Sequence, residues 1–342
     1  MGGLRPGIRA LLTYGLALAL LVPLGVGAYA DPAAAPAIKE LRHTSPKPAS
    51  QPLAVSTPKP APTLTLTTVL GPSGFDQLKA DLNAMAAQSG AQVGISLQEL
   101  SGPGRQNLAL NGTAAFYAAS EYKLPLLMAE AQQVATGQAS ASDTLCYDPY
   151  DPEDGWFDDY EPGSCFSRAE LAMRAGRYSD NTAARILVRY LGGPGALNAY
   201  ARAAGMTNSA LWLPNTTTAN DLAAAWVSEA MGQLGGPSAQ GWLYPILTHT
   251  ASESGIPAGL PATATVVHKT GDMYATQEDA AYVINGHVRY VLAVAVAGLD
   301  EANGWNLIQR ISARVWRYEA SRPDYPTRVI VTPAPVLRDV RH

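Results

Sequence analysis

A serine followed three residues later by a lysine stands at the start of a long apolar run. The segment reads Ala118-Ala119-Ser120-Glu121-Tyr122-Lys123 and continues as Leu124-Pro125-Leu126-Leu127-Met128-Ala129. Residues three apart share one face of a helix, so the spacing predicts that the Lys123 amine lies beside the Ser120 hydroxyl. Lysines are rarely buried without a partner. A serine next to a buried amine is typical of a nucleophile with its base.

Two further short motifs follow in order. Ser179-Asp180-Asn181 lies between two predicted helices, and Lys269-Thr270-Gly271 is predicted to end a strand. Each motif alone is common by chance. The three in this order, each in a fitting context, form a strong combined signal for one catalytic site.

The composition narrows the class of protein. The chain has 342 residues, of which 47% are hydrophobic and 15% are charged, as in a globular protein with ample core. A net charge of −4 without a basic cluster argues against nucleic-acid binding. The chain has no Cys-x-x-Cys or His-Glu-x-x-His spacing, so neither a metal site nor a cofactor is expected.

The first seventy residues are predicted to lie outside the folded domain. Arg5 and Arg9 precede an apolar run that ends in Ala28-Tyr29-Ala30, which indicates a signal peptide over residues 1–30 or an uncleaved N-terminal membrane anchor. Residues 31–70, rich in Pro, Ala and Thr, are expected to form a linker. The chain is therefore expected to work outside the cytoplasm, secreted, periplasmic or tethered to the outer side of a membrane.

The two cysteines enclose an acidic, aromatic segment. In an exported protein the pair Cys146 and Cys165 favours a disulfide, and two unpaired thiols are the alternative. Closing this loop would stabilise the fold by about 3 kcal/mol in the chain-entropy model. Residues 147–161 do not fit a calcium-binding loop, because the register around Gly155 places Tyr150 and Pro152 at ligand positions. The segment is interpreted as a solvated surface loop or as an aromatic rim over a binding cleft.

Caps, turns and periodicity predict an α+β fold over residues 71–320, followed by a loosely ordered tail over 321–342. A helical middle separates a first strand pair from a terminal meander. The expected elements are a helix from Ser73 to about Ser89, strands Ala91 to Leu100 and Asn107 to Leu110, a helix from Ser120 to about Gly137, helices after Ser167, after Ser179-Asp180-Asn181 and from Pro194, a helix Leu222 to Met231 capped by Thr218, strands Thr263 to His268, Ala280 to Ile284 and Val288 to Ala297 with a turn at Asn285-Gly286, and a helix from about Glu301 to Tyr318.

The three motifs resemble those of the class A serine β-lactamases and the related penicillin-binding proteins. The resemblance extends from about Gly71 to Tyr318 and includes residues 179–184, 192–194 and 215–218. It implies a five-stranded antiparallel sheet flanked by helices, a mostly helical subdomain beside it, and an active site between the two.

Chemistry and resemblance together assign the catalytic roles. Ser120 would be the nucleophile and Lys123 its base, in the neutral form that burial, a helix N-terminus and the Lys269 charge would favour by lowering its pKa. Ser179 would pass the proton to the leaving nitrogen. The residues assigned to catalysis are therefore Ser120, Lys123, Ser179 and Lys269.

Substrate contacts are assigned in the same way. Asn181 would orient the substrate amide, and Lys269 with Thr270 would hold its carboxylate. Gly271 would let the strand approach closely. The backbone N–H groups of Ser120 and Asp272 would form the oxyanion hole, and the Asp272 side chain is an alternative determinant of substrate shape.

The chain departs from the family pattern at one place. Class A enzymes carry a loop whose glutamate activates the deacylating water, but here residues 205–214 run directly into Asn215 without an acidic residue. The loop is expected to be deleted and deacylation to be slow. Glu121 and Asp272 lie near the motifs and are candidates to replace the glutamate.

We therefore expect a monomeric, exported serine hydrolase that forms an acyl-enzyme with β-lactams and hydrolyses it slowly. One alternative is a penicillin-binding D,D-peptidase that acts on D-Ala-D-Ala stem peptides of peptidoglycan, and another is a non-catalytic homologue that binds the cell wall. An α/β-hydrolase esterase is disfavoured because the chain lacks a Gly-x-Ser-x-Gly elbow. His268 is interpreted as a packed strand residue, not as a base.

Overall fold

The computed structural model describes residues 74–151 and 155–322, and all of these belong to one compact unit. The predicted signal or anchor over 1–30, the linker over 31–70, the cap Ser73 and almost all of the predicted tail lie outside the described residues. Within the described ranges no helix is both long and apolar enough to cross a membrane.

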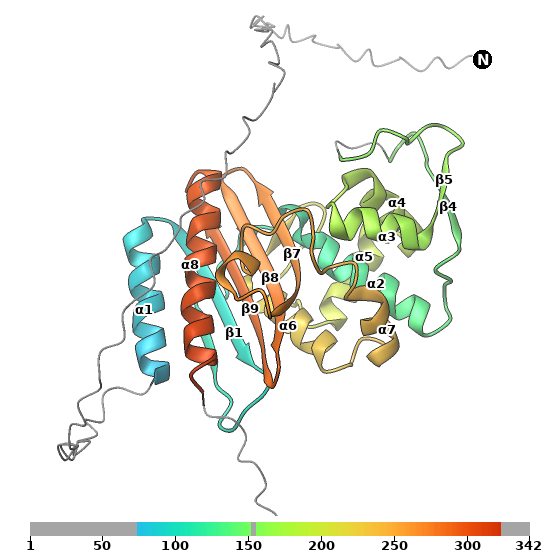
Figure 1. The fold of residues 1–342 in the computed structure, drawn as a ribbon. Coiled ribbons are helices and arrows are strands. Elements are labelled where there is room, and N and C mark those ends of the chain that lie inside the picture. Colours follow the sequence, from blue (N-terminus) through green and yellow to red (C-terminus); the bar gives the residue numbers. More distant parts are fainter. Residues whose placement is uncertain (1–73, 152–154, 323–342) are drawn as a thin grey trace, which may run out of the picture. The chain divides into compact units, whose positions relative to one another are not determined.

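A five-stranded sheet forms one half of the unit, as predicted (Figure 1). Neighbouring strands are antiparallel throughout, in the order β2-β1-β9-β8-β7. The central strand β9 is almost entirely buried, because helices cover the sheet on both faces. The strands are β1 Gln92–Glu99, β2 Asn107–Leu110, β7 Thr265–Met273, β8 Thr276–Asn285 and β9 Val288–Ala297.

Two groups of helices cover the two faces of the sheet. The first and last helices, α1 Gly74–Ser89 and α8 Glu301–Glu319, lie side by side on one face (Figure 1). The opposite face meets a mostly helical region, as predicted. That region consists of α2 Lys123–Ala135, α3 Arg168–Arg177, α4 Asn181–Leu191, α5 Pro194–Ala203, α6 Ala219–Ala230 and α7 Gly236–Leu243, with the 3-10 turn η1 Ala119–Tyr122 and the strand pairs β3 Phe116–Tyr117 with β6 Thr216–Thr217 and β4 Thr144–Cys146 with β5 Cys165–Ser167. The 3-10 turn η2 Pro257–Gly259 packs against α8 instead.

Most helix boundaries follow from local capping. The hydroxyl of Ser167 accepts a hydrogen bond from the Glu170 N–H at the start of α3, and Asp180 caps α4 through the Ala183 N–H. Gly192 ends α4 in the left-handed conformation, with φ 109°. Because these signals act over one helical turn, the sequence was sufficient to locate them.

Several boundaries differ from the prediction: the helix expected from Ser120 begins at Lys123, after the 3-10 turn η1, and the strand expected from Ala280 begins at Thr276. The helix capped by Thr218 begins at Ala219 and not at Leu222, because the cap bond from the Asp221 N–H already lies in its first turn. Strand β7 does not end at the Lys269 motif but continues to Met273, paired with β8 through Met273 and Thr276. Helix α7 was not predicted.

The two tight turns of the meander also differ from what the sequence indicated. Asn285 pairs with Val288, so the loop consists of Gly286 and His287 and not of Asn285-Gly286. Gly286 has φ 59°, which a side chain would disfavour. The β7–β8 turn uses Tyr274 and Ala275 at φ 53° and 56°, and neither residue type signals a turn of this kind.

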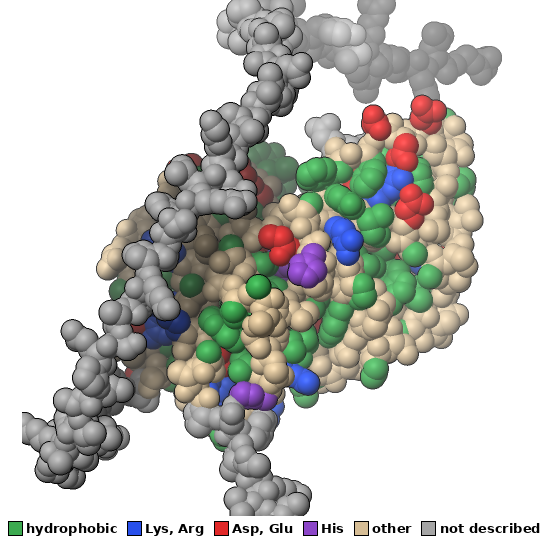
Figure 2. Space-filling model, viewed as in Figure 1, with side chains coloured by type: hydrophobic (Ala, Val, Ile, Leu, Met, Phe, Trp, Pro, Cys, Tyr) green, Lys and Arg blue, Asp and Glu red, His purple; other side chains and the backbone are tan. Residues whose placement is uncertain are grey.

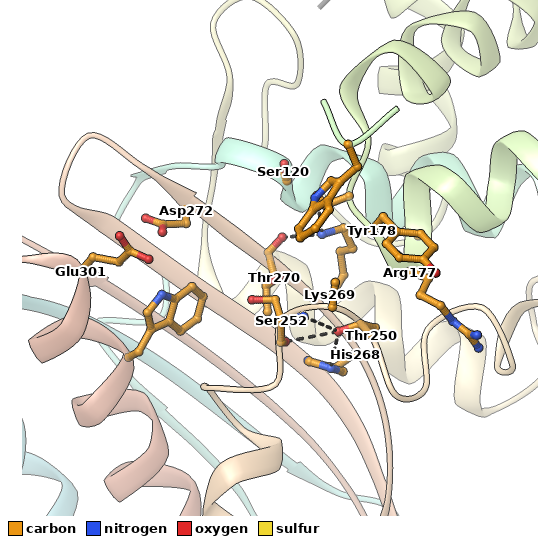
Figure 3. A pocket seen from close by; sticks show the side chains of 15 residues that line it. Ser120, Arg177, Tyr178, Thr250, Ser252, His268, Lys269, Thr270, Asp272 and Glu301 are labelled. Atoms are coloured by element: carbon orange, nitrogen blue, oxygen red, sulfur yellow. Dashed lines mark hydrogen bonds between the residues drawn. The ribbon is translucent and has the colours of Figure 1, made fainter. Parts of the chain in front are cut away.

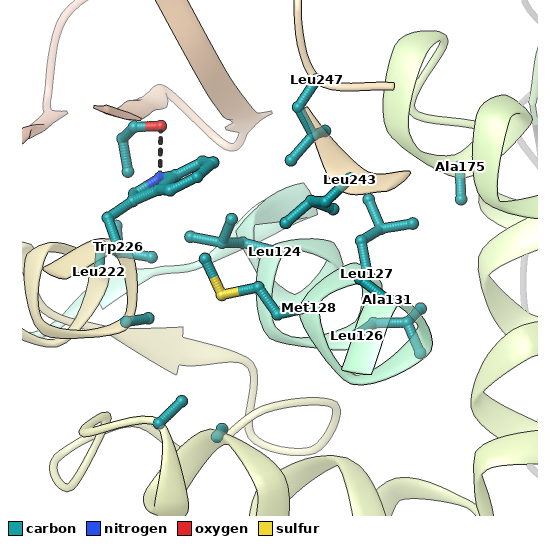
Figure 4. Close-up of a cluster of buried hydrophobic side chains, with 14 of the residues drawn as sticks. Leu124, Leu126, Leu127, Met128, Ala131, Ala175, Leu222, Trp226, Leu243 and Leu247 are labelled. Atoms are coloured by element: carbon teal, nitrogen blue, oxygen red, sulfur yellow. Dashed lines mark hydrogen bonds between the residues drawn. The ribbon is translucent and has the colours of Figure 1, made fainter. Parts of the chain in front are cut away.

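Helix α2 is the centre of the helical region's core. Its apolar residues Leu124, Leu127 and Met128 have no exposed surface (Figure 4). Trp226 of α6 packs beside them, and its indole Nε1 donates a hydrogen bond of 2.9 Å to the Ala280 carbonyl oxygen of β8. This contact joins the helical region to the sheet.

The substitution Trp226→Phe should lower the free energy of unfolding by about 2 kcal/mol, because it leaves a cavity and an unpaired buried carbonyl oxygen. Urea denaturation measures the change. Trp316→Phe, at a half-buried site on α8, is the matched control and should cost about 1 kcal/mol or less. Equal losses in the two variants would contradict the proposed role of the indole hydrogen bond.

Candidate active site

The amine of Lys123 lies where two segments that are distant in sequence meet. Its side chain is fully buried, and Nζ lies 3.0 Å from Ser120 Oγ. The same nitrogen lies 2.6 Å from Asn181 Oδ1 and 2.5 Å from the Ser179 carbonyl oxygen. The predicted pairing of Ser120 with Lys123 is therefore present, and Asn181 contacts the lysine as well as facing the cavity.

Ser179 connects the two lysines of the motifs. Its Oγ lies 3.2 Å from Lys123 Nζ and 3.1 Å from Lys269 Nζ. The residue has φ 58°, in the left-handed region, and Ala119 directly before the nucleophile has φ 42°. Non-glycine residues in this region are uncommon and cluster at functional sites. A hydroxyl between two amines can carry a proton from one side of the site to the other.

Lys269 is the second buried amine. Burial lowers the pKa of Lys269 to about 8, although the negative charges of Glu121 and Asp279 oppose the shift. Its Nζ donates to the Thr270 carbonyl oxygen at 2.6 Å and faces the cavity that Thr270 also lines. A cationic amine at this point can bind a carboxylate.

Gly271 allows β7 to lie directly against η1. A Cβ atom at this position would be 2.8 Å from the Ala118 carbonyl oxygen and 3.3 Å from the Ala119 Cβ. Only a glycine fits at this distance. The close approach brings the backbone of Asp272 to the same edge as Ser120, where the oxyanion hole is predicted.

Two cavities meet at Ser120. One, of about 250 Å³, is lined by Lys269, Thr270 and Thr250, and the other, of about 430 Å³, by Asn181, Tyr122 and Trp212. Ser120, Ser179 and Asp272 line both cavities. The predicted site residues are thus brought together on one cleft.

The smaller cavity has an acidic end and a basic end. Figure 3 shows Asp272 and Glu301 together at one end, and Tyr178 with Arg177 at the other. Ser120 and Lys269 lie between these ends.

Of the two carboxylates suggested as replacements for the missing glutamate, one is excluded. Glu121 is fully buried and lines neither cavity, and burial together with the nearby Glu278 raises the pKa of Glu121 well above its usual range. The suggestion that Glu121 activates water is therefore wrong. Asp272 does face the cleft, and its Oδ1 accepts a hydrogen bond from Gln277 Nε2 at 2.9 Å.

The segment over residues 205–214 contributes an aromatic side chain to the larger cavity. Trp212 lies edge-on to the Tyr122 ring at 5.7 Å, and the Arg185 guanidinium lies over the Trp212 ring at 5.2 Å. Asp272 is the one acidic residue among the described residues that line the larger cavity. Sequence reasoning missed Trp212 and Arg185, because neither belongs to a motif.

The sequence analysis also did not identify His268 as a charged residue. Its ring is fully buried, with Nδ1 2.9 Å from Asp279 Oδ1 and Nε2 3.2 Å from Glu253 Oε1. Burial alone would lower the pKa of His268, but the charge and hydrogen bond of Asp279, together with those of Glu253, raise it to about 9. The packed strand residue is therefore a buried cation, and its partners are carboxylates and Thr250, not a serine nucleophile.

The acidic, aromatic segment over residues 147–161 is held against the site by hydrogen bonds to Asp180. Cys146 and Cys165 are joined by a disulfide at its base. Asp180 accepts hydrogen bonds from the Trp156 N–H at 2.9 Å and from the Tyr160 hydroxyl at 2.8 Å. Trp156 is 66% exposed and lines the smaller cavity, which favours the rim interpretation, while acidic side chains gather at this end of the helical region (Figure 2).

Across residues 74–151 and 155–322, no group of three His, Cys, Asp or Glu side chains is arranged to hold a metal ion. The arrangement that the structure does provide is a serine with a buried lysine, a bridging hydroxyl and a second lysine, at the border of an antiparallel sheet and a helical region. It is the arrangement of serine hydrolases with the β-lactamase/transpeptidase-like fold.

Comparison with known proteins identifies the family. The model of the β-lactamase enzyme family matches residues 77–318, which is most of the chain. The chain belongs to this family, as the motifs indicated. The β-lactamase CTX-M-8 of Citrobacter amalonaticus is 27% identical over 235 residues, covering 61% of this chain and 76% of the relative.

Solved structures agree in fold. PBP-A superposes with a TM-score of 0.66 at 28% identity, covering 71% of this chain and 95% of PBP-A. An ancestral class A β-lactamase, GNCA, gives a TM-score of 0.63 at 27% identity, covering 70% of this chain and 99% of that structure.

The ion pairs of His268 predict a specific pH dependence of stability. The pKa of His268 is raised from 6.5 to about 9, so protonation stabilises the folded state. This contribution is complete below about pH 6.5 and is lost as the pH rises through about 9. The free-energy difference between the wild type and His268→Gln, measured by urea unfolding, should shrink by a few kcal/mol over this window. A pH-independent difference would contradict the charged state of His268.

Proposed function

We propose that this chain is an exported serine hydrolase that forms an acyl-enzyme with β-lactams at Ser120 and releases the product slowly. The observation that carries the proposal is the Lys123 amine, which lies within hydrogen-bond distance of both Ser120 Oγ and Ser179 Oγ while fully buried. A neutral amine in that place can take the proton of the nucleophile and return it to the leaving group.

Acylation proceeds by proton transfers between neighbouring atoms. As Ser120 Oγ bonds to the lactam carbonyl carbon, its proton moves to Lys123 Nζ. The tetrahedral intermediate then collapses with cleavage of the carbon–nitrogen bond. The lactam nitrogen receives a proton from Ser179 Oγ, which is replenished from Lys123. Lys269 and Thr270 hold the substrate carboxylate during these steps, so the reacting carbonyl stays at Ser120.

Deacylation lacks a comparable base. A hydrolytic water must lose its proton as it attacks the ester carbonyl. Among the described residues that line the larger cavity with Ser120, Asp272 is the one acidic residue. Trp212 and Arg185 stand where the shortened segment meets the cavity. An acyl-enzyme without a well-placed base hydrolyses slowly.

A D,D-peptidase acting on D-Ala-D-Ala stem peptides of peptidoglycan is the second candidate. It is favoured by the similarity to PBP-A, because a PBP-A variant has been solved as its acyl-enzyme complex with penicillin G. The lactam and the peptide present the same carbonyl and carboxylate to the site, so the acylation chemistry is shared.

Export is part of the proposal. The disulfide between Cys146 and Cys165 suits an oxidising compartment, and the N-terminal residues have the character of a signal or anchor. Both features fit a substrate in the cell wall or its surroundings.

Benzylpenicillin should add one molecule of penicillin to the intact mass of the chain, and the adduct should persist long enough for manual sampling. The Ser120→Ala variant should show no adduct. Ser238→Ala, at an exposed serine of α7, is the control and should behave as the wild type. An adduct on Ser120→Ala would overturn the assignment of the nucleophile, and wild-type turnover too fast for sampling would show that an efficient base exists.

Lys123→Ala should slow acylation by a factor of about 10² to 10⁴, the usual contribution of a positioned general base. Stopped-flow hydrolysis or acylation of a chromogenic cephalosporin measures the rate, and circular dichroism verifies the fold. Lys79→Ala, at an exposed lysine of α1, should leave the rate unchanged. Acylation at the wild-type rate in folded Lys123→Ala would exclude Lys123 as the base.

A further inference from the structure

Two glutamates are buried close to the cleft without lining it. Glu121 of η1 and Glu278 of β8 have no exposed surface, and neither lines either cavity. Among the described residues, none of their four carboxyl oxygens has a hydrogen-bond partner of ordinary geometry. An ionised carboxylate is almost never buried without a partner. The two side chains therefore need a chemical explanation, and the proposed acylation steps do not use them.

The strand register places both carboxyl groups on one face of the sheet. Glu278 is the direct cross-strand partner of Gly271, so the two positions point to the same side with about 5 Å between their Cβ positions. A Cβ atom on Gly271 would be 3.2 Å from Glu121 Cγ. Glu121 therefore occupies the space that the absent side chain of Gly271 leaves, beside Glu278.

Lys269 lies on the same face of the sheet. It precedes Gly271 by two residues on β7, and alternate residues of a strand share a face. Burial lowers the pKa of Lys269 to about 8, and the negative charges of Glu121 and Asp279 oppose this shift. The glutamate pair, Glu121 with Glu278, is therefore close enough to influence the charge of the lysine.

The other charged groups around Lys269 are committed elsewhere or have the same sign. Asp279 is hydrogen-bonded to the His268 ring at 2.9 Å. Asp272 is exposed at the edge of the cleft. Lys123, joined to Lys269 through a serine hydroxyl, is a second amine. These contacts leave the glutamate pair as the source of negative charge that can balance Lys269.

One proton can satisfy both carboxyl groups of the pair. Burial raises the pKa of Glu278 well above its usual range. Burial, and next the charge of Glu278, raise the pKa of Glu121 in the same direction, although the Lys269 charge and the Ala280 N–H oppose the shift. Two carboxyl groups in one buried site commonly hold one proton between them, and the protonated member donates a hydrogen bond to the other.

We propose that Glu121 and Glu278 share one proton, and that the single negative charge of the pair keeps Lys269 cationic while Lys269 holds the substrate carboxylate. Both glutamates are then positioning residues, which act through the lysine and do not touch substrate. The role given to Lys269 rests on the proposed function, whereas the shared proton does not depend on it. No covalent step is added to the reaction.

The number of protons released on unfolding tests the shared proton without any substrate. At about pH 6 a glutamate of the unfolded chain is ionised, so each proton that the native pair holds is released. Calorimetric unfolding in two buffers of different ionisation enthalpy measures this number. Glu121→Gln and Glu278→Gln should each release one proton fewer than the wild type, because the amide donates to the remaining carboxylate. The double variant should also release one proton fewer, since the wild-type pair holds only one.

The double variant separates the protonation states of the pair. A release two protons smaller than that of the wild type would show that both carboxyl groups are protonated, and an unchanged release would show that both are ionised. Either result would overturn the proposal. If the glutamine double variant does not fold, Glu121→Met/Glu278→Met gives the same count, because apolar side chains of similar volume often replace buried charged groups without loss of stability.

The role of the charge is measured by the pH dependence of acylation with benzylpenicillin. Loss of the Lys269 charge should define the alkaline limb of the second-order rate constant. Both single variants keep one negative charge and should keep this limb, whereas the double variant should move it to lower pH by about one unit. Glu229→Gln is the control, at a glutamate that is also buried without a hydrogen-bond partner in the described part of the chain but lines neither cavity, and it should leave the limb unchanged.

The two measurements separate this inference from the proposed function. If the double variant acylates with the wild-type alkaline limb, or loses rate equally at every pH, the pair does not control Lys269 and the assignment is wrong. If benzylpenicillin forms no adduct with the wild type, the proposed function fails and the role of Lys269 fails with it. The proton count then still decides whether Glu121 and Glu278 share a proton.

Discussion

The burial of one amine organises this molecule. Lys123 has no exposed surface, so its nitrogen must find hydrogen-bond acceptors inside the protein. These come from Ser120 one turn earlier and from Ser179 and Asn181, more than fifty residues away. The helical region therefore has to bring the start of α4 against the start of α2. The Ser179 backbone takes up the left-handed conformation in the same place, where its carbonyl oxygen and its hydroxyl both reach the amine.

The sheet contributes a second set of buried charges on β7 and β8. His268 is held between Asp279 and Glu253, and the next residue along β7 is Lys269, which faces the cleft. Successive residues of a strand point to opposite faces, so His268 contacts Asp279 and Glu253 while Lys269 contacts Ser179. Unpaired buried charges are expensive. The pairing of His268 with two carboxylates shows how this strand keeps its charges inside the fold.

The same cleft is unequally equipped for the two halves of a hydrolysis reaction. For the proposed acylation it has the Ser120 and Ser179 hydroxyls, each within hydrogen-bond distance of the Lys123 amine. For the attack of water it has Asp272 at its edge, while Glu121, a residue of η1, is fully buried. Trp212 and Arg185, which stack on each other, line the larger cavity beside Ser120.

Local signals in the chain were enough for the α+β class and for most helix boundaries, because capping and hydrophobic periodicity act over a few residues. The five-stranded sheet and the candidate site residues followed from the resemblance of the three motifs to a known family. The sequence also placed Ser120 and Lys123 together, since three residues separate them on one helical face. It did not show that Glu121 points into the core, that His268 is an ion-paired cation, or that Trp212 and Arg185 meet. These facts depend on contacts between residues far apart in the chain, such as His268 with Glu253 and Arg185 with Trp212. Burial and charge pairing of that kind arise only when the sheet and the helical region pack against each other, and no local pattern encodes them.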